Sequence, residues 1–141
     1  MSAPPPRTAE VRIEVPFHDL DPAGYVWHGN YAKYLELARC ALLKTFDYNY
    51  DAMVRSGYTW PVVDMQIRYA RPLRFGDEIR VLATLTEWEF RLRIDYAIHN
   101  LRSGERTTKA MTTQVAVELA TGELCLRSPP VLFERLGLDS Q

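Results

Sequence analysis

The chain has 141 residues, which is the length of one domain and enough for one hydrophobic core. Hydrophobic residues make up 47% and charged residues 25%, so the composition is that of a globular rather than a disordered protein. The formal net charge of −1 excludes a chain-wide positive field for a nucleic-acid backbone or an anionic membrane. An anionic ligand would therefore need a local cluster of basic residues.

Cysteine usage and the N-terminal residues bear on the compartment. Cys40 and Cys125 are too few for a disulfide framework or a zinc site, and we expect both to be buried small residues. The first residues lack the cationic and apolar regions of a secretory signal, and no apolar run approaches the roughly 20 residues of a membrane helix. These features predict a cytoplasmic protein without a membrane span or a nucleic-acid partner.

The first third of the chain changes its periodicity. We expect the Pro-rich residues 1–9 to be a disordered tail, ahead of a single domain over residues 10–141. Apolar residues alternate with polar ones from Val11 to Phe17, which predicts a strand. From 30 to 44 they recur at spacings of three and four, which predicts a helix. Because few residues of this helix are charged, we expect other elements to enclose most of it.

The remainder reads as one short helix or turn region followed by strands. The helix or turn region covers 46–56 and ends at Gly57. Alternation predicts strands at 63–69, 79–85, 90–98, 107–119 and 124–127, and a last helical turn or two at 131–138. In the long strand we expect the odd-numbered residues from Met111 to Leu119 to share one face.

This order of elements predicts an α+β fold rather than a parallel, doubly wound one. An antiparallel sheet of five to six strands has one face to bury, and the long helix has apolar surface nearly all round. The economical packing curls the sheet around this one central helix.

The loop between the first strand and the helix combines two features that acyl transfer requires. Asp21 supplies a carboxylate where Pro22 and Gly24 constrain the backbone. Free N–H groups of a helix N-terminus begin near His28, where the helix dipole favours negative charge. The first group suits attack or base catalysis, and the second suits an oxyanion hole.

The same segment resembles the signature of the 4-hydroxybenzoyl-CoA thioesterase family of hot-dog-fold proteins. The pattern is Asp-x-Asp-x-x-Gly-x-Val, followed after a short gap by Tyr at the helix start. It is met here by Asp19, Asp21, Gly24, Val26 and Tyr31. The likeness covers about residues 10–130. It implies a hot-dog fold, active sites built by dimers, and a homotetramer made of two such dimers.

The resemblance also implies roles for individual residues. Asp21 is the catalytic carboxylate, which attacks the thioester carbonyl or activates a water molecule, and the sequence does not choose between these. The backbone N–H of His28 binds the oxyanion, and its side chain is a candidate to orient water or substrate. Gly24 lets the loop fold back without a side-chain clash. We expect Asp19, in contrast, to cap or brace the loop.

Further residues are candidates for substrate binding. Trp27 and Tyr31 are candidates for an acyl pocket, with core packing as the alternative. Glu36 is a candidate to hold a polar acyl tail, or else it pairs with Arg39 or with another subunit. The CoA phosphates require basic residues, of which Arg91 and Arg93 stand where the family tends to hold the nucleotide. The other basic candidates are Arg68, Arg71, Arg74, Arg102, Arg106 and Lys109, and an ordinary charged sheet face is the alternative for most of them.

The sequence therefore predicts an acyl-CoA thioesterase that needs no metal, cofactor or prosthetic group, with CoA as part of its substrate. The alternative is a non-catalytic hot-dog protein that binds acyl-CoA or an acyl-carrier protein. A third interpretation, thioester release in polyketide or aromatic-acid biosynthesis, shares the chemistry and differs in the donor. The acyl group stays open.

Overall fold

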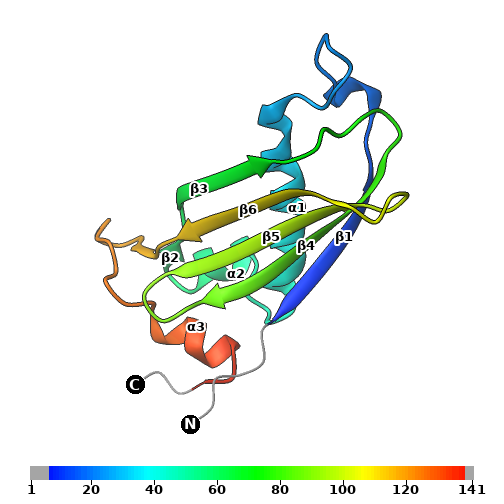
Figure 1. Cartoon of the computed structure of the whole chain (residues 1–141). Coiled ribbons are helices and arrows are strands. Elements are labelled where there is room, and N and C mark those ends of the chain that lie inside the picture. Colours follow the sequence, from blue (N-terminus) through cyan, green and yellow to red (C-terminus); the bar gives the residue numbers. More distant parts are fainter. Residues whose placement is uncertain (1–6, 139–141) are drawn as a thin grey trace.

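The computed structural model describes residues 7–138 and has an α+β architecture (Figure 1). Five antiparallel strands form one sheet in the order β1-β4-β5-β6-β3, and the long helix α1 (Tyr31–Lys44) packs against one face of it. The strands are β1 (Thr8–Glu14), β3 (Val62–Tyr69), β4 (Glu78–Glu87), β5 (Leu92–Asn100) and β6 (Arg106–Gln114). The predicted fold class is therefore confirmed.

Short elements connect and cap this framework. They are the 3₁₀ turns η1 (Phe17–Asp19) and η2 (His28–Asn30), the helices α2 (Tyr50–Arg55) and α3 (Pro130–Arg135), and a two-stranded sheet of β2 (Tyr58–Thr59) and β7 (Val117–Glu118). The helix α2 begins where the Asn49 side chain accepts a hydrogen bond from the Ala52 amide (2.9 Å). Both short helices overlap the ranges predicted for them.

The core lies between α1 and the middle of the sheet. Alternate residues of β4 and β5 point inward and are buried, because successive side chains of a strand face opposite sides. These residues are Ile79, Val81, Ala83, Leu85, Leu92, Ile94, Tyr96 and Ile98. Leu35, Ala38 and Leu42 of α1 are fully buried in the same cluster. Each large apolar side chain buried in this way stabilises the fold by about 1.5–3 kcal/mol.

The edge strand β3 is not covered in the same way. It pairs with β6 on one side only, and seven of its eight residues are exposed. The helix α1 packs mainly over β1 and β4, so Met65 on the inner face of β3 stays 39% exposed. One side of α1 is also open, with Leu37 52% exposed. The expectation that other elements enclose most of this helix is therefore wrong for that side within a single chain.

Several predicted boundaries need correction. The strand β1 already begins at Thr8, so two residues of the expected disordered tail belong to the sheet, while residues 1–6 lie outside the described part. Phe17 leaves the first strand, because Pro16 ends the ladder and a 3₁₀ turn follows. Phe90 belongs to the β4–β5 turn and is 60% exposed. The predicted strand at 124–127 is reduced to a single bridge between Leu124 and Val117.

The predicted long strand at 107–119 divides into β6 and β7, and its buried face is not the one with the larger side chains. Thr108, Ala110, Thr112 and Gln114 are buried, whereas Leu119 is half exposed. The inner face of β6 uses small and polar residues, and the buried Gln114 amide donates to the Trp60 carbonyl (2.7 Å). The predicted shared face of residues 111–119 therefore ends where β6 ends, and Thr113 on that face is buried too.

Two further observations bear on the expected compartment and cofactors. Cys40 and Cys125 are free and half-buried rather than fully buried. No helix in residues 7–138 is long and apolar enough to cross a membrane. Within the same residues, no three or more His, Cys, Asp or Glu side chains gather in a way that could hold a metal ion.

Candidate active site

Asp21 lies in a tight turn that its own side chain stabilises. Its Oδ1 accepts hydrogen bonds from the amides of Ala23 (2.9 Å) and Tyr25 (3.3 Å). Gly24 has a φ of +89°, a left-handed conformation that other residues rarely adopt, and this supports the predicted need for glycine. Asp21 is half-buried, and none of the described residues donates a hydrogen bond to its Oδ2. One carboxylate oxygen is therefore held and the other is available.

The N-terminal end of α1 is extended by the turn η2. The first amides of a helix have no acceptor inside it, and the backbone hydrogen bonds of the described residues include none donated by His28 or Gly29. The hydroxyl of Tyr69 donates to the His28 carbonyl (2.9 Å). Because a peptide group is planar, this bond also fixes the direction of the Gly29 amide. The helix start thus presents oriented donors to any group placed before it.

The carboxylate and the helix start line the same hollow. A pocket of about 280 Å³ is bounded by Asp21, Tyr25, Val26, His28, Tyr31, Tyr69, Ala70, Arg71 and Pro72. The ring of Tyr31 is 2% exposed and meets the ring of Tyr69 edge to face, with centroids 4.7 Å apart. The pocket therefore joins the loop, the first turn of α1 and the end of the edge strand β3.

Asp19, two residues before Asp21, has a structural role. Its buried carboxylate accepts hydrogen bonds from Lys33 Nζ (2.8 Å) and from the Tyr34 hydroxyl (2.6 Å), both on α1. Burial by itself would raise the pKa of Asp19, but these two hydrogen bonds together with the positive charges of Lys33 and His18 hold the pKa below its ordinary value. Its backbone carbonyl also accepts from the Trp27 amide (2.9 Å). Asp19 therefore ties the loop to the helix, as the sequence predicted.

Trp27 does not line the pocket that contains Asp21. Its ring lies over Gly29, where an added Cβ would come within 2.3 Å of the indole, and it contacts the ring of His28 with centroids 5.1 Å apart. Half of Trp27 is exposed. Within one chain Trp27 is therefore not among the residues that line this pocket, and its place in an acyl pocket stays a prediction.

Three other predicted binding residues lie away from the pocket. Glu36 is exposed on α1 and forms no ion pair with Arg39 or with any other described residue. Arg91 pairs with Glu87 (2.9 Å) in the β4–β5 hairpin, and Arg93 pairs with Asp95 (3.2 Å) on β5. Register places Arg93 beside Thr113, at the end of the sheet opposite Tyr69. Within one chain, Arg91 and Arg93 therefore do not approach Asp21.

Two other arginines lie at or beside the pocket. Arg71 lines the pocket and pairs with Glu105 (3.1 Å), and the guanidinium of Arg74 lies 5.1 Å from the ring centre of Tyr25. Both arginines were named from the sequence, but only among eight basic candidates. Tyr69 was predicted only as a strand residue, because no local pattern indicates that the end of β3 reaches the helix start.

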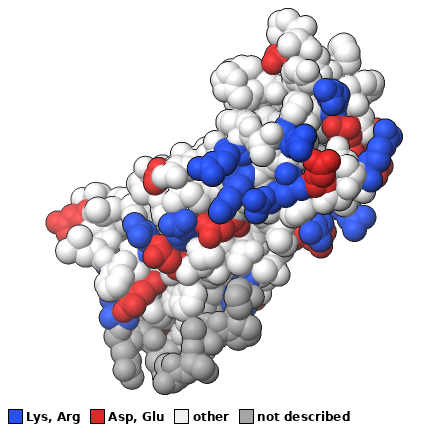
Figure 2. Space-filling model, viewed as in Figure 1, with Lys and Arg blue, Asp and Glu red and all other residues white. Residues whose placement is uncertain are grey.

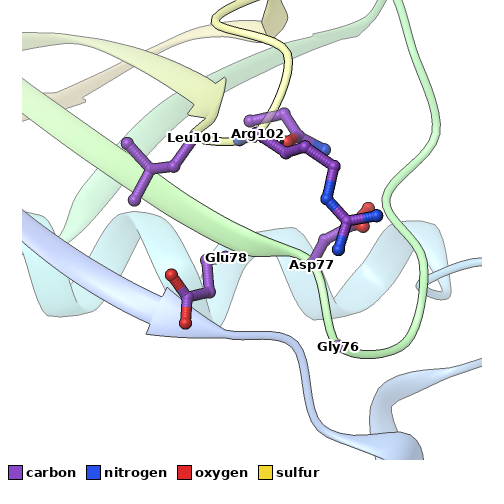
Figure 3. Close-up of a pocket in the computed structure, with 6 residues that line it drawn as sticks. Gly76, Asp77, Glu78, Leu101 and Arg102 are labelled. Carbon is purple, nitrogen blue, oxygen red and sulfur yellow. Dashed lines mark hydrogen bonds between the residues drawn. The ribbon is translucent and has the colours of Figure 1, made fainter.

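Two other hollows lack comparable chemistry. One of about 430 Å³ lies at the turn end of the sheet, between Gly76–Glu78 and Asn100–Arg102 (Figure 3). There Asp77 accepts a hydrogen bond from the Arg74 amide, which makes it a turn residue. The other lies on the outer face of the sheet, where Figure 2 shows basic and acidic side chains mixed. It contains Arg68, Arg93 and Lys109 beside Asp95.

Comparison with known proteins shows the family of the chain. The sequence profile of the thioesterase-like superfamily matches residues 15–136. A Synechocystis protein provisionally named esterase sll0410 is 34% identical over 128 residues, which are 90% of this chain and 77% of the relative. A Bacillus subtilis protein provisionally named acyl-CoA thioesterase YneP is 34% identical over 107 residues, which are 75% of this chain and 77% of the relative.

A solved structure shares the fold at lower identity. The DHNA-CoA thioesterase of Staphylococcus aureus superposes with a TM-score of 0.81 over 92% of this chain and 89% of that chain, at 24% identity. The described fold, with one helix against a curled antiparallel sheet, is thus that of known thioesterases. The chain belongs to the thioesterase-like superfamily of hot-dog proteins, and this confirms at the level of the family the thioester hydrolase predicted from its sequence.

Proposed function

We propose that this chain is an acyl-CoA thioesterase, which hydrolyses an acyl-CoA to the free acid and CoA. One observation carries the proposal: Asp21, His28 and Tyr31 line the same pocket, so a carboxylate and the start of α1 face one cavity. The family match and the 34% identity to a protein named as an acyl-CoA thioesterase support the reaction class.

The proposed chemistry uses groups of the chain itself. Asp21 either attacks the thioester carbonyl, with the CoA thiolate leaving and water cleaving the resulting anhydride, or takes a proton from the water that attacks. In both cases negative charge develops on the carbonyl oxygen. The amides of His28 and Gly29 would stabilise this charge, because they are oriented before the reaction begins. This reaction calls for no metal or prosthetic group, and CoA enters as part of the substrate.

Replacement of Asp21 by Asn tests the proposal. Turnover of acyl-CoA, followed by thiol release, should fall at least about 100-fold, the scale of losing a general base, while the fold is retained. Asp51→Asn, at an exposed carboxylate on α2, is a matched control that should stay near wild-type activity. A fully active Asp21→Asn protein would contradict the mechanism. Saturable acyl-CoA binding without thiol release by the wild-type protein would select the alternative, a non-catalytic binding protein.

The acyl group belongs to the same proposal. The resemblance to 4-hydroxybenzoyl-CoA thioesterases suggests an aromatic ring, and the aromatic wall of Tyr31 and Tyr69 suits a ring as well as a short chain. Trp27 and Glu36 lie outside the pocket within one chain. A panel of aromatic, short-chain and longer acyl-CoAs, with an acyl-carrier-protein thioester as a second donor, would rank these substrates by kcat/KM.

Arg71 and Arg74 are the proposed contacts for the CoA phosphates. Arg71 lines the pocket, and Arg74 adjoins it through Tyr25. We place Arg91 and Arg93 in this role only if a second copy of the chain brings them to the pocket from across the β3 edge. One double variant replaces Arg71 and Arg74 by Gln, and another replaces Arg91 and Arg93 by Gln. The pair whose replacement raises KM while kcat stays unchanged is the pair that contacts the CoA phosphates.

A homodimer, and a tetramer of two dimers, is also part of the proposal. The edge strand β3 exposes unpaired backbone groups together with Val62, Val63, Met65 and Tyr69, which favours antiparallel pairing with a second copy. The pocket lies at the end of this strand, so the second copy would also border the pocket. Light scattering on the purified protein would measure the assembled mass, and fractionation would test the expected cytoplasmic location.

A further inference from the structure

Arg39 is a buried cation with no acidic partner in the described chain. It is 6% exposed, on the side of α1 that faces β5 and β6. Its Nε donates to the Tyr50 hydroxyl (2.8 Å), and its Nη1 makes a long hydrogen bond to the Tyr96 hydroxyl (3.5 Å). No Asp or Glu among the described residues forms an ion pair with it. Because arginine stays charged, a buried guanidinium bound only to phenols is unusual.

The hydrogen bonds of this cluster leave donors available. The Tyr96 hydroxyl is shared with the buried hydroxyl of Thr112 (2.7 Å), and Nη2 of Arg39 donates to none of the described residues. A carboxylate could accept two parallel hydrogen bonds from one guanidinium, which neutral phenols cannot do. The cluster therefore has the charge and the free donor that an anionic group would match.

The cluster also lies beside the open inner face of β3. Met65 is the register partner of Thr112, so their side chains share one face, and Met65 is 39% exposed. Ala32, Glu36 and Arg39 follow one another at spacings of four and three, so they lie along one flank of α1. Because the side chain of Ala32 is small, this flank of α1 takes up little space between the pocket and Arg39.

The distance between the pocket and the cluster suits an acyl chain. Tyr31, which lines the pocket, and Arg39 are eight residues apart on α1, or about 12 Å along its axis. An acyl group extended from the thioester along α1 would have to span this distance to bring a terminal carboxylate to the guanidinium.

We propose that Arg39, with the hydroxyls of Tyr50 and Tyr96, forms a subsite for a carboxylate at the far end of the acyl group. This inference rests on the proposed thioesterase function and assigns it a substrate class, the CoA monothioesters of dicarboxylic acids. The neutral acyl groups of the same length would leave the guanidinium without a counter-ion.

Matched pairs of substrates test the subsite separately from the hydrolysis. The wild-type protein is assayed with succinyl-, adipyl- and suberyl-CoA, each against the monocarboxylic acyl-CoA of equal length. We expect kcat/KM to be at least about 10-fold higher for the dicarboxylic member of at least one pair, the range of a charge-assisted hydrogen bond. Equal or lower values for the dicarboxylic member of every pair would overturn the subsite and leave the thioesterase function standing.

Substitutions of Arg39 add a second readout. Arg39→Gln should lower the dicarboxylic-to-monocarboxylic ratio of kcat/KM roughly 10- to 100-fold, and Arg39→Lys should lower it less, because the charge is kept while the planar fork is lost. Arg12→Gln removes an equal charge from the outer face of β1 and should leave the ratio unchanged. If the ratio does not change in Arg39→Gln, Arg39 has a purely structural role and the subsite is overturned. The same conclusion follows if the only change in this variant is a smaller assembled mass by light scattering.

If Arg39→Gln does not fold, the wild-type ratios decide by themselves. If the wild-type protein hydrolyses none of these esters and no member of the aromatic, short-chain, longer and acyl-carrier-protein panel, the thioesterase proposal fails. Calorimetric titration of the wild-type protein with adipate, against hexanoate, then decides the subsite alone. Preferential binding of adipate supports it, and equal binding or no binding of both acids overturns it.

Discussion

The two halves of the loop before α1 differ in how they are held. The first half is anchored: the buried Asp19 binds Lys33 and Tyr34, and its carbonyl binds the Trp27 amide. The second half, from Asp21 to Tyr25, is a largely exposed turn held by its own hydrogen bonds and, at Tyr25, by a bridge to Arg74. Two carboxylates separated by one residue thus have different roles. Burial with full hydrogen bonding makes one structural, and half-exposure beside free amides leaves the other available for chemistry.

The largest expected effect on stability is at Asp19. Asp19→Asn should lower the free energy of unfolding by about 2–3 kcal/mol, because a buried carboxylate that accepts two hydrogen bonds loses its charge. Urea unfolding measures this loss. The Asp21→Asn protein serves as the control and should stay within about 0.5 kcal/mol of wild type, since its turn is exposed. Equal losses in the two variants would contradict the division of roles.

Acid unfolding tests the structural role of the Asp19 carboxylate in a second way. The folded protein holds the pKa of Asp19 below its unfolded value of about 3.9, so its contribution to stability is complete above that pH. The contribution is lost as the pH falls below about 4 toward the lower folded pKa. Unfolding free energies measured between pH 7 and pH 3 should therefore decrease less steeply in Asp19→Asn than in wild type. Parallel pH profiles would show that Asp19 is not the group responsible.

The substitution Gly29→Ala tests whether the packing of Trp27 on Gly29 stabilises the protein. An added Cβ would meet the Trp27 ring at 2.3 Å, so in Gly29→Ala the exposed indole must swing away. We expect a loss of about 1–2 kcal/mol in stability, the usual cost of a lost packing contact. The double variant Trp27→Ala with Gly29→Ala should be no less stable than Trp27→Ala alone. Additive losses would place the cost in the backbone instead.

The smallest expected effect is that of Tyr69→Phe on kcat, through the hydrogen bond to His28 before α1. The Tyr69 hydroxyl holds the His28 carbonyl at 2.9 Å, and its loss should lower kcat about 2- to 10-fold, the range of one neutral hydrogen bond. KM should change little, because the substrate still has the same pocket. Steady-state kinetics separates the two constants. A change confined to KM would indicate that Tyr69 contacts the substrate and does not orient the peptide.

Local patterns were sufficient for the site's two central residues but not for its walls. Asp21 and the helix start are close in sequence, so a single motif contained them together with the left-handed Gly24. Tyr69 and Arg71 come from the far end of β3 and reach the pocket only through the order of strands in the sheet. Trp27 and Arg93 fitted the family's pattern by position, yet the packing over Gly29 and the strand register direct them elsewhere.

The sequence by itself determined the long helix, most of the strands, the α+β class and the position of the loop before α1, because periodicity, turn residues and capping are local properties of the chain. Only the tertiary structure decided which face of β6 is buried, that β3 is an open edge, and that Arg39 lies buried without an acidic partner. These outcomes depend on which strands become neighbours and on where α1 crosses them. Contacts between residues distant in the chain set them, and no local pattern records such contacts.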